Sequence, residues 1–149
     1  AIVQYMRKTY SLLIGDPTAE KIKMSLGSAV ALTPEEEMDV KGRDLVSGLP
    51  KVVRVDSSGI RDAIQEPLPR IVNAVRRALE MTPPELSSDI LETGIVLTGG
   101  GSLIRGLSQL LQDETGLPVR VDVDPLTSVV RGTGKILDDV NRYGKVLTT

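Results

Sequence analysis

The fold class follows from one short apolar run and the glycine turn behind it, Gly94-Ile95-Val96-Leu97-Thr98-Gly99-Gly100-Gly101-Ser102. A continuous apolar run of this length is typical of a strand that is buried on both faces. Apolar residues then recur at helical spacing from Leu103 to Leu111. The order strand, turn, helix predicts one unit of an α/β layer fold.

The residues after this unit repeat the pattern. Valines alternate with charged residues over 119–123, which predicts a second strand. Asp124-Pro125 favours the start of a last helix that reaches Val140. Residues 58–149 then supply three helices and only two strands, and two strands cannot cover the apolar faces of three helices. We therefore expect further strands of this sheet upstream of Ala1.

A strongly periodic stretch precedes the apolar run. Its apolar residues recur every three or four positions from Ile60 to Leu79, which predicts a helix of about five turns. Pro67 and Pro69 should bend that helix, because each lacks a backbone donor and crowds the preceding turn. The Pro83-Pro84 pair then ends it.

The first third of the chain predicts a small α+β lobe. Helical spacing over 2–13 indicates the end of an amphipathic helix, and a second helix follows over 17–26. Alternating residues at 38–41 and 53–56 predict two strands. The connection over 42–50 is too long for a two-residue hairpin and predicts a wider loop or a short extra strand.

Composition narrows the classes of function. The chain has 149 residues, 40% of them hydrophobic, enough for one domain or two small lobes. Its 18 basic and 20 acidic residues are interspersed, so no nucleic-acid partner is expected. The lack of cysteine and histidine excludes thiol catalysis, imidazole chemistry and Cys/His zinc sites. A chain without cysteine also suits a reducing compartment, and we expect the cytoplasm.

The ends and the hydropathy of the chain add two expectations. No apolar run approaches the ~20 residues that span a bilayer, and the first eight residues lack the layout of a signal peptide. We therefore expect no membrane-crossing segment. The first residue is not Met and lies in a helical pattern, so we expect a piece of a longer protein.

The glycine turn is the first candidate site. Three glycines let a ligand approach the backbone, and free N–H groups at the start of the next helix favour anionic or polar oxygen atoms. A tight strand-to-helix turn without a ligand explains the same residues equally well. No Gly-Lys-Ser/Thr follows, so the turn is not a phosphate loop of the Walker type, and it does not match the dinucleotide fingerprint.

Glu20 and Lys23 are the second candidate. They lie three residues apart on the helix over 17–26 and share one of its faces. A carboxylate can accept hydrogen bonds from ribose hydroxyls, while a lysine stem can lie against a purine ring. On an arbitrary helix, a solvent-exposed ion pair is the simpler explanation. Gly132 and Gly134 are unusual in the last helix, and we favour tight helix-to-sheet packing over a ligand contact there.

Five stretches carry a resemblance to a known family. The most specific are Ile14-Gly15-Asp16-Pro17-Thr18-Ala19-Glu20-Lys21-Ile22-Lys23, Gly42-Arg43-Asp44-Leu45-Val46-Ser47-Gly48-Leu49-Pro50 and Pro83-Pro84-Glu85-Leu86-Ser87-Ser88-Asp89-Ile90. The others are the glycine stretch through Leu103 and Asp124-Pro125-Leu126-Thr127. In this order they resemble the MreB family of bacterial actin homologues, over nearly the whole chain. The resemblance implies an α/β fold: an incomplete actin-like ATPase (ribonuclease H-like) inner lobe with a small α+β lobe inserted.

The resemblance also implies a division of the chain. Residues 1–15 would end a connecting helix, residues 16–57 would form a small outer lobe, and residues 58–149 would form the inner lobe without its upstream strands. In the family, the phosphate-binding loops, the catalytic side chain and the carboxylate that organises magnesium belong to sequence before Ala1. We therefore expect no catalytic or metal-binding residue here, and no ATP hydrolysis by this piece alone.

A nucleotide site is implied in the same way. ATP or ADP would lie between this part of the protein and an upstream domain. The cofactor-binding residues that the resemblance implies are Glu20, Lys23, Gly99, Gly100, Gly101 and Ser102. Glu20 and Lys23 would hold the ribose and adenine, and the glycine turn would line the base and sugar side of the pocket.

The resemblance finally implies partners. Subunits of an actin-like filament stack head to tail, a contact that never closes, and bound nucleotide would favour the closed cleft that presents both contact surfaces. The parent protein would form filaments at the cytoplasmic face of the cell membrane that direct cell shape and cell-wall synthesis. Membrane proteins of cell-wall elongation would be its partners.

Two alternatives stay open on the sequence. One is another actin-fold ATPase, such as a plasmid-segregation filament, a sugar kinase or a chaperone ATPase domain, although the compact small lobe and its 42–50 loop favour the shape-determining type. The other is an interaction module that binds no nucleotide, in which the glycine turn and the Glu20/Lys23 pair are only structural.

Overall fold

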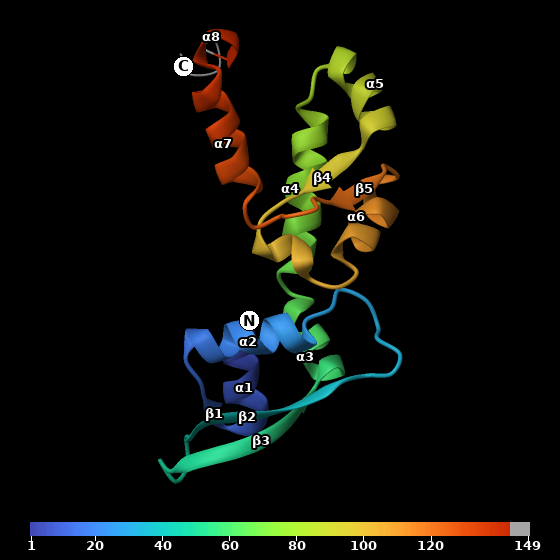
Figure 1. Cartoon of the computed structure of the whole chain (residues 1–149). Coiled ribbons are helices and arrows are strands. Elements are labelled where there is room, and N and C mark those ends of the chain that lie inside the picture. Colours follow the sequence, from blue (N-terminus) through green and yellow to red (C-terminus); the bar gives the residue numbers. More distant parts are fainter. Residues whose placement is uncertain (144–149) are drawn as a thin grey trace.

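The computed structural model describes residues 1–143, which form two bodies stacked end to end (Figure 1). The first body, residues 1–64, holds α1 (Ile2–Tyr10), β1 (Leu12–Leu13), α2 (Asp16–Leu26), β2 (Glu37–Asp44), β3 (Pro50–Asp56) and α3 (Ser57–Ile64). Its three strands form an antiparallel sheet in the order β1-β2-β3. The helices α1, α2 and α3 pack on one another and on this sheet.

The alternation in β2 and β3 explains how the sheet covers a core. Met38 pairs with Val55 and Val40 with Val53, so the four apolar side chains share one face. Val40 and Val55 are buried there. The core continues through side chains that the helices supply, including Met6, Ile22 and Ile60, all fully buried.

The second body, residues 68–143, is built around two parallel strands. It holds α4 (Leu68–Glu80), α5 (Pro84–Thr93), β4 (Ile95–Leu97), the 3-10 helix η1 (Gly100–Leu103), α6 (Leu107–Thr115), β5 (Val119–Val121), α7 (Ser128–Asp138) and α8 (Val140–Tyr143). Ile95 pairs with Val119 and Leu97 with Val121 in a parallel register. The fold is therefore mixed α/β with two small sheets, as the sequence predicts.

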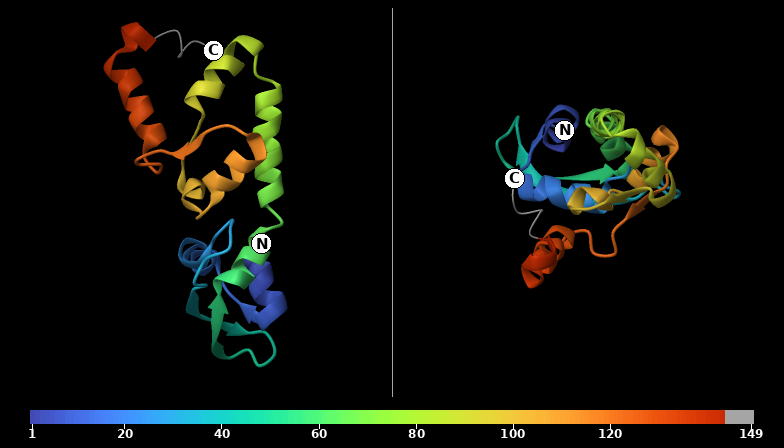
Figure 2. Two further views of the ribbon diagram at one scale, coloured as in Figure 1. Left: turned by 90° about the vertical axis from the view of Figure 1, so that its right-hand side faces the viewer. Right: turned by 90° about the horizontal axis from the view of Figure 1, so that it is seen from above.

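Helix α7 stands apart from the rest of the second body in two perpendicular views (Figures 1 and 2). It has no buried residue, and Val129 and Val130 on it are about three-quarters exposed, at 73% and 72%. A Cβ added to Gly132 or Gly134 would meet no atom of the described residues within 4 Å. The tight helix-to-sheet packing that we favour for these glycines is therefore wrong for residues 1–143.

Proline positions correct two sequence predictions. The predicted helix over 60–79 is two helices, because α3 ends at Ile64 and Pro67 caps the start of α4. Pro84 does not simply end a helix, since it opens α5. Proline suits the first turn of a helix, where its missing N–H has no partner to lose.

Three further boundaries, and the burial of one strand, differ from the prediction. Strands β2 and β3 extend into the predicted 42–50 loop and leave a five-residue turn, 45–49. The glycine turn opens a 3-10 helix, and α6 begins only at Leu107. The last helix begins at Ser128 instead of Asp124-Pro125. Strand β4 is not buried on both faces, because Val96 is 41% exposed.

Among residues 1–143, none of the helices combines the length and the apolar character that a membrane span needs.

Candidate functional site

Helix α2 provides the first wall of a pocket. Ile22 and Leu26 on one side of this helix are buried in the core, which turns Glu20 and Lys23 outward. Lys23 Nζ lies 2.7 Å from Glu20 Oε2, an ion pair between residues three apart on the helix. Because the Lys23 and Glu20 side chains are 31% and 56% exposed, water screens this pair and both groups remain available to a ligand.

The glycine turn between β4 and α6 provides the second wall. Ser102 is buried, and its Oγ donates a 2.6 Å hydrogen bond to the carbonyl oxygen of Gly99. The N–H of Gly99 donates at 2.6 Å to the carbonyl oxygen of Pro125, which ties the turn to the segment before α7. These bonds hold the backbone of Gly100 and Gly101 at the surface.

The two walls face each other across a pocket of about 270 Å³. It is lined by Glu20, Lys23, Met24, Gly100, Leu103, Ile104 and Leu126. Glu20 and Lys23 lie about 80 positions before the glycine turn in the sequence, and the fold brings them to one cavity with Gly100. A Cβ at Gly100 would lie 3.4 Å from Leu126 Cδ2, so a larger residue there would narrow the pocket.

The other members of the glycine turn lie elsewhere. Gly101 and Ser102 line a neighbouring apolar cavity of about 240 Å³, together with Ile71 and Val75 of α4. Gly99 lines neither cavity, and its positive φ of 77° redirects the chain. The structure thus brings Gly100 to the same cavity as the Glu20/Lys23 pair, and Gly99, Gly101 and Ser102 do not line that cavity.

A network of short polar contacts positions Leu126 over the pocket. Ser128 Oγ donates to the carboxylate of Asp122 and to the carbonyl oxygen of Asp124, and Thr127 Oγ1 donates to the Asp124 carboxylate. The Ser128 hydroxyl and the N–H of Val123 hold the pKa of the Asp122 carboxyl below its ordinary value. The segment that carries Leu126 is therefore anchored on both sides.

Sequence reasoning missed the apolar part of this pocket. Met24 is 75% exposed and lies four residues after Glu20, so helical spacing alone could have placed it on the same face. Leu103 and Ile104 end the glycine turn and could have been included with it. No local sequence pattern could have placed Leu126 in the pocket, because its position depends on the hydrogen bonds of the loop before α7.

The arrangement suits a flat ring that carries hydroxyl groups. The walls formed by Met24, Leu103 and Leu126 can cover an apolar ring face, and Glu20 can accept hydrogen bonds from hydroxyls at the rim. Within residues 1–143, no cluster of three or more acidic side chains has the geometry to hold a metal ion.

Comparison with known proteins places the chain in a family. The model of the family described as MreB/Mbl protein matches residues 1–145. The chain is 51% identical to the cell shape-determining protein MreB of Escherichia coli strain K12 over 144 residues, which cover 97% of the chain and 42% of that protein. It is 43% identical to the cell shape-determining protein Mbl of Bacillus subtilis strain 168 over the same length.

Solved structures agree on the fold. The structure of MreB5 of Spiroplasma citri bound to ADP superposes with a TM-score of 0.88 at 38% identity, over 97% of this chain and 44% of that one. The AMPPNP-bound structure of the same protein gives a TM-score of 0.87. The fold is thus actin-like, and the chain spans about two fifths of the length of the relatives it matches.

Proposed function

The chain belongs to the MreB/Mbl family of actin-like proteins, and from this premise we propose that it supplies the adenosine side of a nucleotide cleft. One observation carries the proposal: Glu20, Lys23 and Gly100 line a single cavity although they are far apart in the sequence. The ADP-bound and AMPPNP-bound structures of Spiroplasma citri MreB5 support the choice of an adenine nucleotide.

Each residue has a role in this proposal. Glu20 accepts hydrogen bonds from the ribose hydroxyls, and the Lys23 stem lies along the base. Gly100 lets the backbone approach the sugar, while Gly99, Gly101 and Ser102 fix the shape of the turn on which Gly100 lies. Met24 and Leu126 cover the faces of the base.

Equilibrium binding of a fluorescent ADP analogue tests these roles. Glu20→Ala should weaken binding about tenfold or more, because a hydrogen bond to a charged acceptor is worth about 1.5–3 kcal/mol. Gly100→Val should weaken it comparably by pushing a branched side chain toward Leu126. Lys21→Ala is the matched control, since Lys21 is exposed on α2 and does not line the pocket. Unchanged affinity in both Glu20→Ala and Gly100→Val would refute the site.

We further propose that the segments of the chain are those of the family. Residues 1–15 end a connecting helix, residues 16–57 form the small outer lobe, and residues 58–149 belong to the inner lobe. In the structure, α1, β1 and α3 pack with residues 16–57 in the first body, and the two bodies separate at Pro67. The family resemblance is therefore what supports these boundaries.

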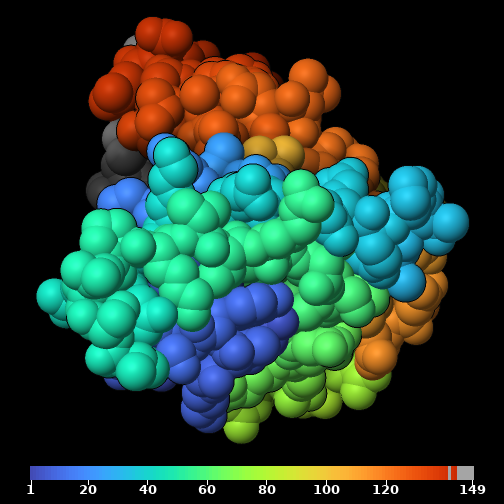
Figure 3. Space-filling model, turned by 90° about the horizontal axis from the view of Figure 1, so that it is seen from below, coloured from blue at the N-terminus to red at the C-terminus, as the bar shows by residue number. Residues whose placement is uncertain are grey.

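Head-to-tail self-association is the second part of the proposal. The β2–β3 turn exposes Val46 and Leu49 at one end of the molecule, and α5 exposes Leu86 and Leu91 at the other (Figure 1). Seen from below, the β2–β3 hairpin and α1 make up much of the first of these ends (Figure 3). Exposed apolar side chains at opposite ends suit a heterologous contact, which continues into a filament.

Two end-blocking variants test the filament. Val46→Asp and Leu91→Asp should each prevent pelleting of the polymerised protein with ATP, since each places a charge at one end. An equimolar mixture should form dimers and nothing longer, because one intact end remains on each molecule. Sedimentation velocity distinguishes these species, and filaments formed by either variant alone would contradict the proposed contact.

The broader function follows the family. We propose that the parent protein binds ATP or ADP and forms filaments at the cytoplasmic face of the membrane that direct cell shape and cell-wall synthesis. Its partners would be a second copy of itself and membrane proteins of cell-wall elongation. The curated relatives are named for determination of cell shape, which supports this assignment.

A further inference from the structure

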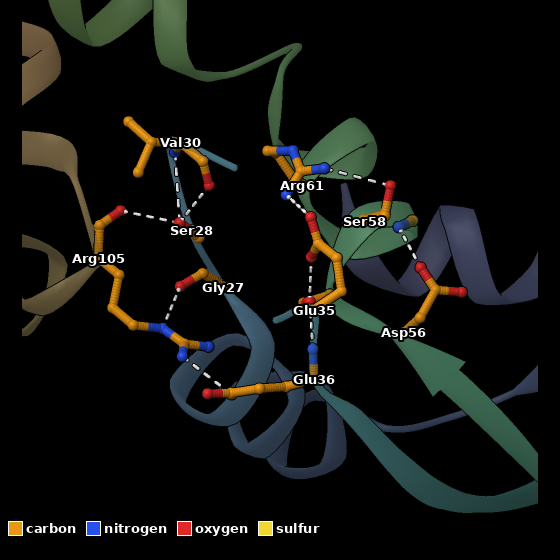
Figure 4. A network of polar contacts seen from close by, with 11 residues as sticks. Gly27, Ser28, Val30, Glu35, Glu36, Asp56, Ser58, Arg61 and Arg105 are labelled. Carbon is orange, nitrogen blue, oxygen red and sulfur yellow. Dashed lines mark hydrogen bonds and ion pairs between the residues drawn. The ribbon is translucent and has the colours of Figure 1, made fainter. Parts of the chain in front are cut away.

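A backbone segment of the first body is hydrogen-bonded to the second body beside the pocket. Residues 27–30 follow α2 and run along Arg105, which lies between η1 and α6. The N–H of Ala29 donates at 2.7 Å to the carbonyl oxygen of Arg105, and Ser28 forms a parallel bridge with Arg105. Ser28 is fully buried, and its Oγ donates to the carbonyl oxygen of Val30 at 2.6 Å (Figure 4). The main chains of the bodies are therefore in direct contact here.

The Arg105 side chain reaches back across this contact. Its Nη2 donates at 2.6 Å to the carbonyl oxygen of Ser25, and its Nε donates at 3.5 Å to that of Gly27. These carbonyls end α2 and have no partner within the helix. A cation at the C-terminus of a helix also interacts favourably with the helix dipole. Arg105 thus caps α2 from the other body.

A third contact fixes the direction of the guanidinium group. Arg105 Nη1 lies 2.9 Å from Glu36 Oε2, at the end of the loop that leads into β2 (Figure 4). The planar fork of arginine can serve these three acceptors at once, whereas the ammonium group of lysine cannot match the geometry. The Glu36 pair is half exposed and contributes little by itself, so the shared geometry matters more than the ion pair.

Arg105 connects the two walls of the pocket. It directly follows Ile104, which lines the pocket, and it holds the end of the helix that carries Glu20 and Lys23. We propose that Arg105 is a positioning residue that sets the separation of α2 from the glycine turn and thereby the affinity for adenine nucleotide. This inference rests on the proposed function and adds to it a residue that does not line the pocket.

A neighbouring ion pair offers a matched control. Glu35 accepts a 2.8 Å hydrogen bond from Arg61 Nη1 (Figure 4). It accepts another from Ser57 Oγ, and all three residues belong to the first body. Glu36, the next residue, instead pairs with Arg105 of the second body. Loss of Arg61 therefore removes an arginine–glutamate pair of the same chemistry without touching the junction between the walls.

Nucleotide affinity and thermal unfolding together separate positioning from general stability. Arg105→Ala should raise the Kd for ADP about tenfold at a temperature where the variant is folded, and Arg105→Lys should recover only part of this loss. Arg61→Ala should lower Tm while its Kd stays within about twofold of wild type. Wild-type affinity in Arg105→Ala together with a lowered Tm would overturn the inference.

A measurement without ligand completes the test. The chain contains no cysteine, so spin labels can be attached at Lys21→Cys on α2 and Gln112→Cys on α6. Arg105→Ala should broaden or shift the distance distribution between these labels, and Arg61→Ala should not. An unchanged distribution in Arg105→Ala would refute the positioning role. A parent protein that carries this chain unaltered and binds no ADP would refute the proposed function instead, and the label distances would still decide the role of Arg105.

Discussion

The two bodies differ in how completely they bury their apolar side chains. In the first body, Met6, Ile22 and Val55 are fully buried beneath the sheet and helices. In the second body, α5 and α7 have no buried residue, and Val123 is 96% exposed. Both bodies have amphipathic helices, so the difference lies in what covers them.

This contrast separates two kinds of information in the sequence. Apolar periodicity predicts that a helix forms and which of its faces is apolar. It does not say which segment covers that face. For α2 the cover is the sheet and helices of the same body, whereas for α7 no cover exists among residues 1–143.

Shortening one apolar side chain in each body tests this contrast in burial most directly. Ile22→Ala should lower the free energy of unfolding by about 2–5 kcal/mol, because it leaves a cavity in a packed core. Val130→Ala on α7 should change it by no more than about 0.5 kcal/mol. Urea titration followed by circular dichroism measures both, and equal losses would mean that α7 is packed as closely as α2.

A glycine substitution tests how closely the two bodies pack at their junction. Gly106 has a φ of +74°, and a Cβ there would lie 2.5 Å from Val30 Cγ2. Gly106→Ala should therefore destabilise by about 2–3 kcal/mol, the sum of backbone strain and overlap. Gly116→Ala, at a φ of +70° but with open space, should lose only about 1 kcal/mol.

A double variant shows whether the overlap is the cause. Val30→Ala added to Gly106→Ala should recover part of the lost unfolding free energy, and added to Gly116→Ala it should recover none. If the two glycine variants were equally destabilised, the close contact between the bodies at this point would be contradicted.

The smallest expected effect concerns acid stability of the first body. Hydrogen bonds from Ser57 and Arg61 hold the pKa of Glu35 below its ordinary value of about 4.5. A lowered folded-state pKa stabilises the fold above the unfolded value, and this stabilisation is lost as pH falls through the folded pKa. Glu35→Gln should therefore flatten the decline of Tm below pH 4.5. An unchanged acid slope would show that Glu35 contributes nothing to it.

The sequence predicted the elements whose signals are local. The helix over 17–26 and the alternating strands of the first body are confirmed, because their core-facing residues recur at the period of the element. The two strands predicted in the last third of the chain are confirmed as β4 and β5, although β5 ends at Val121 and Val96 on β4 is exposed. The actin-like fold came from motif resemblance, and the comparison with solved structures confirms it.

The elements that were missed depend on contacts far along the chain. Strand β1 has two residues, and it exists only because it pairs with Asp44 and Arg43 of β2. By contrast, helix α5 was missed because the Pro83-Pro84 pair was interpreted as the end of a helix, whereas Pro84 opens α5. In the pocket, Leu126 depends on the Asp122–Ser128 contact, which no local pattern reveals. The roles of Glu20, Lys23 and the glycine turn in nucleotide binding stay predictions.

The most direct test of the adenosine site is an NMR titration of the isotope-labelled chain with ADP. The amide resonances of Lys23 and Gly100 should shift together with one midpoint, since α2 and the glycine turn line one cavity. Inorganic phosphate at the same concentration should leave both in place. Shifts confined to one wall, or centred on the groove between α4 and α6 near Asn73 and Leu110, would contradict an adenosine pocket between the two bodies.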